Sequence, residues 1–169
     1  MNAFWTCVLV DGTALSIAVS IVILGSLAYN PRLWIGDAPE PVRRLAPPLS
    51  PAERRDRWVV AGLFLLTIVA GIAWSATRLI ARQGAPSFGT LLTHFLGVFF
   101  LFNLVDLVVI DWLVLLVMRP RFLSRLSVPG LSYEETVGGY SYHFVGFLKG
   151  LGVITVLALI AASATYALM

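Results

Sequence analysis

Four long apolar stretches alternate with shorter segments in which the charged residues and prolines gather. The apolar stretches cover residues 3–28, 58–80, 91–118 and 145–168. Each reaches the length of about 20 residues that a helix needs to cross the hydrocarbon core of a bilayer. The pattern therefore predicts an all-α, polytopic membrane protein with four transmembrane helices in a bundle.

Composition agrees with this fold class. Hydrophobic residues make up 59% of the 169 residues and charged residues 12%, and the mean hydropathy is +0.88. A soluble domain does not carry so much apolar surface. The segments outside the four stretches are too short for a soluble domain of their own. Residues 1–169 are therefore predicted to form a single four-span transmembrane domain.

The basic residues predict the orientation. Residues 29–57 hold six of the 12 Lys and Arg residues and residues 119–150 hold four, whereas only Arg78 and Arg82 lie between the second and third stretches. The positive-inside rule then places both longer loops in the cytoplasm and both termini outside, in the inner membrane of a bacterium. Acidic residues interrupt the basic ones, so nucleic acid is not an expected partner. The expected partners are anionic lipid headgroups at the cytoplasmic face.

The third apolar stretch carries the most unusual residues. Asn103, Asp106 and Asp111 stand near its middle, where each carboxylate costs about 2.5 to 3.5 kcal/mol on insertion scales. At the 100° per residue of an α-helix the three side chains fall within a sector of roughly 140° and share a face. They are predicted to form an intramembrane polar site that relays protons or cations or binds a ligand. The alternative is that they hold helices together through hydrogen bonds.

Two pairs of side chains are predicted from matching depths. Lys149 enters the fourth stretch about as far from the cytoplasmic end as Asp111 does, which predicts an ion pair between them. The alternative is that Lys149 snorkels to the membrane interface. Near the outer side, Asp11 and His94 lie at similar depths, which predicts a hydrogen bond that is either structural or responsive to pH.

The cytoplasmic loop after the third stretch holds a second candidate group. Its members, together with the first residues that follow, are Tyr133, Glu134, Glu135, Tyr142 and His143. These residue types could act as acids and bases on a lipid headgroup or an amphipathic small molecule. No recognised catalytic spacing is present, and polar and aromatic residues also gather at headgroup level without any catalytic role.

Metal and cofactor chemistry is not expected. The two histidines, His94 and His143, fall on opposite sides of the predicted membrane, so they cannot share a metal ion or a haem. Cys7 is the single cysteine, which excludes an intramolecular disulfide and a CxxC redox pair.

Local signals mark helix starts and contacts. The sequence Ser50-Pro51-Ala52-Glu53 is a capping box with Pro at the first helical position, which predicts that the second helix begins there. Six of the nine prolines lie in residues 31–51, which predicts an extended, poorly helical loop. Gly146 and Gly150 form a GxxxG motif that is typical of close helix packing, within one chain or in a homo-oligomer.

Several of these segments together resemble an uncharacterised family of small four-span bacterial integral membrane proteins. The resemblance rests on scattered anchors: Asn30-Pro31-Arg32-Leu33-Trp34, Phe102 to Trp112, Pro129-Gly130, Tyr142-His143-Phe144, Gly146-Phe147 and Gly150. It implies the architecture and no activity or ligand.

The leading functional hypothesis is translocation or sensing of protons or a small ion through the buried carboxylates of the third helix. The second hypothesis is a structural or assembly subunit that docks a membrane partner protein, and the third is an interfacial enzyme. Catalysis is the least expected of the three. A polar cavity that reaches Asp106 would favour the first hypothesis, and enclosure of that carboxylate in hydrogen bonds would favour the second.

Overall fold

The computed structural model describes residues 3–169, which form helices and loops without a strand. Four helical segments are long and apolar enough to cross a membrane. They are α1 (Ala3–Tyr29), α3 (Pro51–Gln83), α4 (Phe88–Val105) with its continuation η2 (Asp106–Met118), and α6 (Tyr140–Leu168). The predicted all-α, four-span fold class is confirmed.

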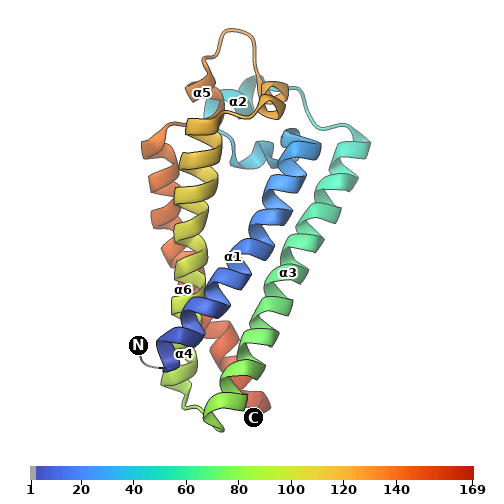
Figure 1. Cartoon of the computed structure of the whole chain (residues 1–169). Helices are drawn as coiled ribbons and strands as arrows, with labels where there is room; N and C mark the ends of the chain where they lie inside the picture. Colours follow the sequence, from blue (N-terminus) through green and yellow to red (C-terminus); the bar gives the residue numbers. More distant parts are fainter. Residues whose placement is uncertain (1–2) are drawn as a thin grey trace.

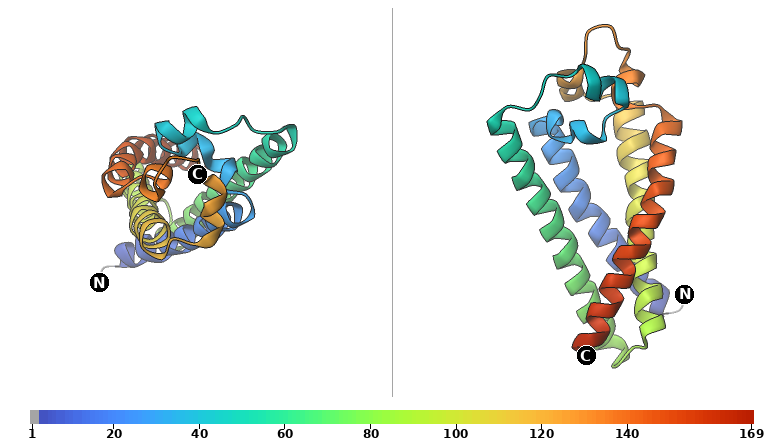
Figure 2. Two further views of the ribbon diagram at one scale, coloured as in Figure 1. Left: turned by 90° about the horizontal axis from the view of Figure 1, so that it is seen from above. Right: turned by 180° about the vertical axis from the view of Figure 1, so that it is seen from behind.

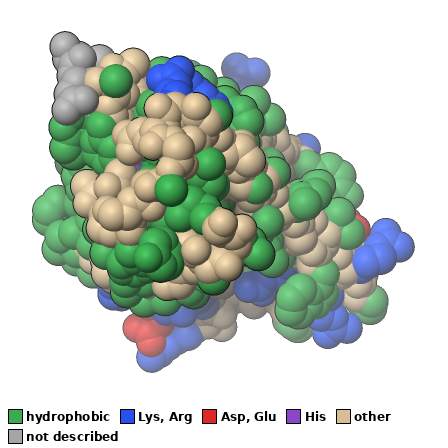
Figure 3. All heavy atoms as spheres, turned by 90° about the horizontal axis from the view of Figure 1, so that it is seen from below, with side chains coloured by type: hydrophobic (Ala, Val, Ile, Leu, Met, Phe, Trp, Pro, Cys, Tyr) green, Lys and Arg blue, Asp and Glu red, His purple; other side chains and the backbone are tan. Residues whose placement is uncertain are grey.

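The four segments form a wedge. α1 packs against both α3 and α4, and α4 packs against α6. α3 and α6 approach each other at the end of the bundle where both chain termini lie and stand apart at the opposite end (Figures 1 and 2). We call these the terminal end and the loop end. Seen from the terminal end, the surface is mostly hydrophobic or uncharged, with charged side chains toward the margins (Figure 3).

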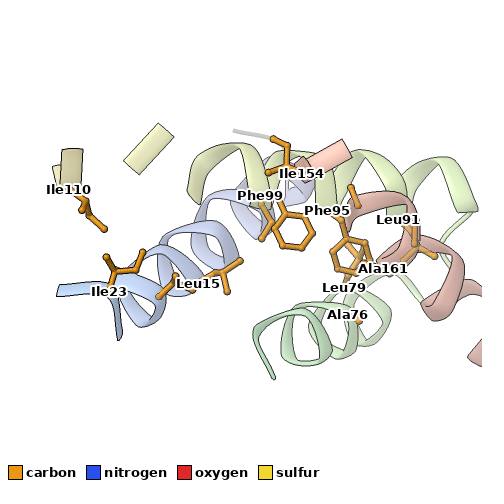
Figure 4. Packing of buried hydrophobic residues seen from close by; sticks show 14 of the residues in the cluster. Leu15, Ile23, Ala76, Leu79, Leu91, Phe95, Phe99, Ile110, Ile154 and Ala161 are labelled. Atoms are coloured by element: carbon orange, nitrogen blue, oxygen red, sulfur yellow. The ribbon is translucent and has the colours of Figure 1, made fainter. Parts of the chain in front are cut away.

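A shared apolar core closes the terminal half of the bundle. Val19, Leu79 and Phe95 have no exposed surface, and Phe99 is 1% exposed. Figure 4 shows the rings of Phe95 and Phe99 among side chains from the other long helices. The small residues Ala158, Ala161 and Ala162 line this side of α6, and small residues let helix backbones approach closely in a membrane.

The predicted start of the second helix is confirmed. The Ser50 hydroxyl accepts a hydrogen bond from the Glu53 backbone N–H (3.2 Å), and the Glu53 carboxylate accepts one from the Ser50 backbone N–H (2.8 Å). Pro51 occupies the first helical position, where its missing N–H costs nothing. The Arg32 guanidinium binds the same carboxylate (Nε to Oε1, 2.8 Å), which fixes the preceding loop against the start of α3.

The prediction that this preceding loop is extended and poorly helical is wrong. It contains the 3₁₀-helix η1 (Pro31–Asp37) and the short helix α2 (Glu40–Leu45). Pro31 and Pro41 fall in the first turns of η1 and α2, where proline is tolerated, and the Asn30 side chain caps η1 by accepting from the Arg32 backbone N–H (3.0 Å). Two more short helices, η3 (Arg121–Leu126) and α5 (Tyr133–Val137), complete the cover of the loop end (Figure 1).

The second half of the third span is not an α-helix. The 13 residues of η2 form a π-helix, a conformation that usually occurs as a single turn and often at functional sites. It ends at Arg119, whose backbone is left-handed (φ 48°) and whose N–H bonds to the Val114 carbonyl oxygen five residues earlier (3.1 Å). The assumption of 100° per residue for this segment is therefore wrong. Hydrogen bonds from i to i+5 place Asp106 and Asp111 one above the other, whereas an α-helix would turn them roughly 140° apart.

Candidate functional site

A cavity of about 890 Å³ lies between the two sides of the wedge at the loop end. Side chains of α1, α4, η2 and α6 form most of its wall, and η1, α2, η3 and α5 cover it from the loop end. Apolar groups such as Leu27, Phe102, Ile110 and Leu115 dominate this wall, and α3 contributes the single residue Phe64. The polar residues in the second half of the third span open onto this space.

Asn103, Asp106, Asp111 and Lys149 all line the cavity, as does His143. The four residues of the predicted intramembrane site thus face one space, on two antiparallel helical segments. Their mutual contacts differ from those predicted.

The predicted ion pair between Asp111 and Lys149 is wrong. Asp111 pairs with His143 instead, with 3.1 Å between Oδ1 and Nδ1, and His143 is 8% exposed. The reason is the start of α6. Hydropathy placed the span start at residue 145, whereas the helix begins at Tyr140, so His143 already lies at the level of Asp111. Lys149 comes six residues later, about 9 Å deeper, and forms no ion pair within the described chain.

Asp106 is the free carboxylate of the site. It lies one π-helical turn deeper than Asp111 and lines the cavity. Within residues 3–169 its side chain makes no hydrogen bond or ion pair. Lys149 also lines the cavity, from the neighbouring helix α6, so the cavity is lined by an unpaired carboxylate and an unpaired ammonium.

Asn103 joins two helices. Its Nδ2 donates to the Phe147 carbonyl oxygen (3.1 Å), and a Cβ added at Gly150 would collide with its side chain. Gly150 therefore makes the close contact that the GxxxG motif predicts, whereas a Cβ at Gly146 would meet nothing within 4 Å. For Asn103 the observed geometry fits the second alternative, in which the side chain holds two helices together through a hydrogen bond.

This difference gives a matched test. We expect Gly150→Ala to lower the free energy of unfolding in detergent by about 1 kcal/mol, because the added methyl group displaces Asn103 from its interhelical hydrogen bond. Gly146→Ala should leave it unchanged, since space is open there. Denaturant titration of both variants measures the difference, and equal effects would show that Asn103 is not held by close packing at Gly150.

A second polar cluster is buried at the terminal end. Asp11 and His94 are 2% and 0% exposed, and 3.4 Å separates Asp11 Oδ2 from His94 Nε2. Their predicted proximity is confirmed. Ser75 lies between them and donates to Asp11 (2.8 Å) while contacting His94 Nε2 (2.7 Å). The Arg78 guanidinium also binds Asp11, a contact that counting Arg78 as a loop charge had missed.

This cluster does not have the geometry of a hydrolase triad. In such a triad the carboxylate binds the imidazole nitrogen opposite the one that contacts Ser. Here Asp11 and Ser75 lie on the same nitrogen of His94, and Nδ1 has no partner among the described residues. No residue of the cluster lines the cavity, and its contacts join α1, α3 and α4.

The predicted acid–base group at the loop end does not assemble. The Tyr133 hydroxyl donates to the Leu115 carbonyl oxygen (2.6 Å), and its ring stacks with Arg119. Glu134 forms an exposed ion pair with Arg119 (3.4 Å), and Glu135 completes the capping box of α5. Each of these side chains therefore has a separate structural contact.

The remaining two members of that group line the cavity. Tyr142 donates to the Asp37 carbonyl oxygen (2.8 Å) at the cavity cover, and His143 faces Asp111, not the α5 carboxylates. The pKa of the Asp37 carboxyl lies above its usual range because the surrounding protein desolvates it, which outweighs the lowering effect of Arg57 and Arg43.

Within residues 3–169, no three His, Cys, Asp or Glu side chains gather closely enough to hold a metal ion.

No protein family, curated protein or solved structure matches this chain. The resemblance to small four-span bacterial membrane proteins therefore stays a prediction.

Proposed function

We propose that the protein translocates protons through its membrane-embedded cavity, with Asp106 as the central proton-binding group and the Asp111–His143 pair as the relay toward the loop end. In this proposal the protein lies in a bacterial inner membrane with its loop end in the cytoplasm, as the distribution of basic residues indicates.

The unpaired Asp106 carboxylate carries the proposal. A carboxylate that served only to join helices would be enclosed by hydrogen-bond donors. Asp106 instead lines a cavity of about 890 Å³ and has no side-chain partner among the described residues. An ionisable group that is buried in a membrane protein and faces a cavity is typical of proton and ion pathways.

The π-helix supports a relay. It brings Asp111 to the same side as Asp106, one turn nearer the loop end, and Asp111 contacts His143 at 3.1 Å. Carboxylate and imidazole groups in sequence are the usual components of intramembrane proton relays, because histidine exchanges protons readily near neutral pH.

An apolar barrier separates this relay from the terminal end. Leu15 and Val19 on α1, with Val98 and Phe99 on α4, are buried between the cavity and the cluster around Asp11. Closure of the cavity toward the terminal end is what one state of an alternating-access cycle requires.

Water access to Asp106 can be measured with a cysteine. Cys7 is the single native cysteine and is 1% exposed, so the wild-type protein gives the background. We expect Asp106→Cys to react with a small membrane-impermeant thiol reagent added from the loop side, whereas Val98→Cys in the apolar barrier stays unreactive. Equal protection of both cysteines would show that Asp106 is enclosed, which contradicts the proposal.

A flux assay tests proton translocation itself. Proteoliposomes that contain the wild-type protein should dissipate an imposed pH gradient faster than protein-free liposomes, and Asp106→Asn should return the rate to that of the liposomes. Glu40→Gln removes an exposed loop-end carboxylate and should keep the wild-type rate. A wild-type rate no faster than that of empty liposomes, or full activity in Asp106→Asn, would reject proton translocation.

A further inference from the structure

The cavity is much larger than a proton pathway needs. One water molecule takes about 30 Å³ of liquid volume, whereas this cavity has about 890 Å³. Sites of about 300 to 1,000 Å³ with mainly apolar walls are those that hold organic ligands. Leu27, Phe64, Ile110 and Leu115 give this cavity such a wall, so the size and lining indicate an occupant with a substantial apolar part.

Two unpaired charges of opposite sign face this space. The Asp106 carboxylate on η2 and the Lys149 side chain on α6 line the cavity from two helices that pack side by side, and they form no ion pair with each other or with other described residues. Asp106 is partly buried, where a charge without a partner is costly, whereas the Lys149 side chain is exposed on α6. A cationic ligand would satisfy only Asp106 and an anionic ligand only Lys149, whereas a ligand head that carries both signs satisfies both.

A third polar group in the site also lacks a partner. His143 is 8% exposed, its Nδ1 binds Asp111, and its Nε2 has no hydrogen-bond partner within the described chain. The interior next to the cavity therefore holds a buried imidazole nitrogen that the described residues leave without a hydrogen bond.

One side of the cavity lies between α3 and α6. The buried residues of α3, Ser75, Ala76 and Leu79, lie near its terminal end, and Figure 2 shows α3 and α6 apart at the loop end. The short helices cover the loop end itself. On α6, Gly146 lines the cavity, and no atom lies within 4 Å of where its Cβ would be. Between α3 and α6 the cavity therefore has few lining residues, since α3 contributes only Phe64 and the space beside Gly146 is open.

We infer that the cavity binds an amphipathic zwitterion that enters sideways from the bilayer, with its ammonium at Asp106, its phosphate at Lys149 and its acyl chain along the apolar wall. This inference rests on the proposed function, since such a molecule would be the cargo whose movement the proton site serves.

Titration calorimetry of the purified protein in maltoside micelles tests this inference with three probes of similar apolar size. Lysophosphatidylethanolamine carries both charges, dodecylamine only the ammonium, and dodecyl phosphate only the anion. We expect saturable binding of the zwitterion that is at least about tenfold tighter than binding of either singly charged probe, since one charge-assisted hydrogen bond contributes about that factor.

Variants of the protein test which side chain binds each charge of the ligand. Lys149→Gln should remove the advantage of the zwitterion over dodecylamine, and Asp106→Asn should remove its advantage over dodecyl phosphate. Arg54→Gln, which removes an exposed basic residue at the loop end, should change neither. Gly146→Phe should weaken binding of all three probes by filling the opening, and because space is open there it should fold.

The outcomes separate the two proposals. Equal affinities for the three probes, or affinities that are unchanged in both charge variants, would overturn the inference. If this happens while Asp106→Cys is labelled and Asp106→Asn abolishes proton flux, only the cargo is wrong. If zwitterion binding holds without proton flux, the cavity is a binding site and proton translocation is wrong.

Discussion

Arg78→Met should lower the free energy of unfolding in detergent by about 3 to 5 kcal/mol, because removing one partner of a buried ion pair leaves the other charge uncompensated. The stranded group is Asp11, which is 2% exposed and has Arg78 as its permanently charged partner. Denaturant titration of the folded bundle measures the loss. The double variant with Asp11→Asn should recover much of the stability, since no carboxylate is then left unpaired.

Arg82→Met provides the matched control. Arg82 lies one helical turn further along α3 and contacts the Cys7 sulfur (3.1 Å) without a described carboxylate partner. We expect this variant to lose much less stability than Arg78→Met. Equal losses would mean that the basic side chains act through membrane anchoring and not through Asp11.

The second large effect concerns the Asp111–His143 pair. Asp111→Asn and His143→Phe should each cost about 1.5 to 3 kcal/mol, the range for a lost hydrogen bond to a charged group. The double variant should cost less than the sum, with a coupling energy above the 0.3 to 0.5 kcal/mol or so of scatter expected for independent sites. Thermal and denaturant unfolding of the four proteins complete the cycle.

Lys149→Met distinguishes the observed pair from the one that the sequence predicted. Lys149 has no ion-pair partner in the described chain, so we expect its effect to add to that of Asp111→Asn. Strong coupling between positions 111 and 149, with additive effects at 111 and 143, would restore the predicted pair and contradict the structure.

The sequence predicted the number of spans because apolar length is a direct physical requirement of the bilayer. The capping box at Ser50 was equally readable, since its four residues carry the whole motif. The chemistry-bearing positions Asp106 and Asp111 stood out because carboxylates are rare in such stretches. For these features the determining interactions are local.

The contacts of the site depended on geometry that is not local. The five-residue spacing of Asp106 and Asp111 matches a π-helix, but the α-helical period was the natural assumption for an apolar run. A hydropathy boundary at residue 145 placed His143 in the headgroup region, although the helix begins earlier, at Tyr140, with Gly139 as its N-cap. The cavity itself follows from the divergence of α3 from α6, which no single stretch of sequence encodes.

The π-helix also changes how the third span fits a bilayer. Phe88–Met118 comprises 31 residues, and at about 1.5 Å per residue a straight α-helix of that length would extend about 46 Å, well beyond a hydrocarbon core of about 30 Å. A π-helix holds more residues in each turn and so advances less per residue. The 13 residues of η2 therefore shorten the span and reduce its hydrophobic mismatch. The same widening that stacks the two carboxylates thus limits how far the apolar surface of this span extends beyond the lipid.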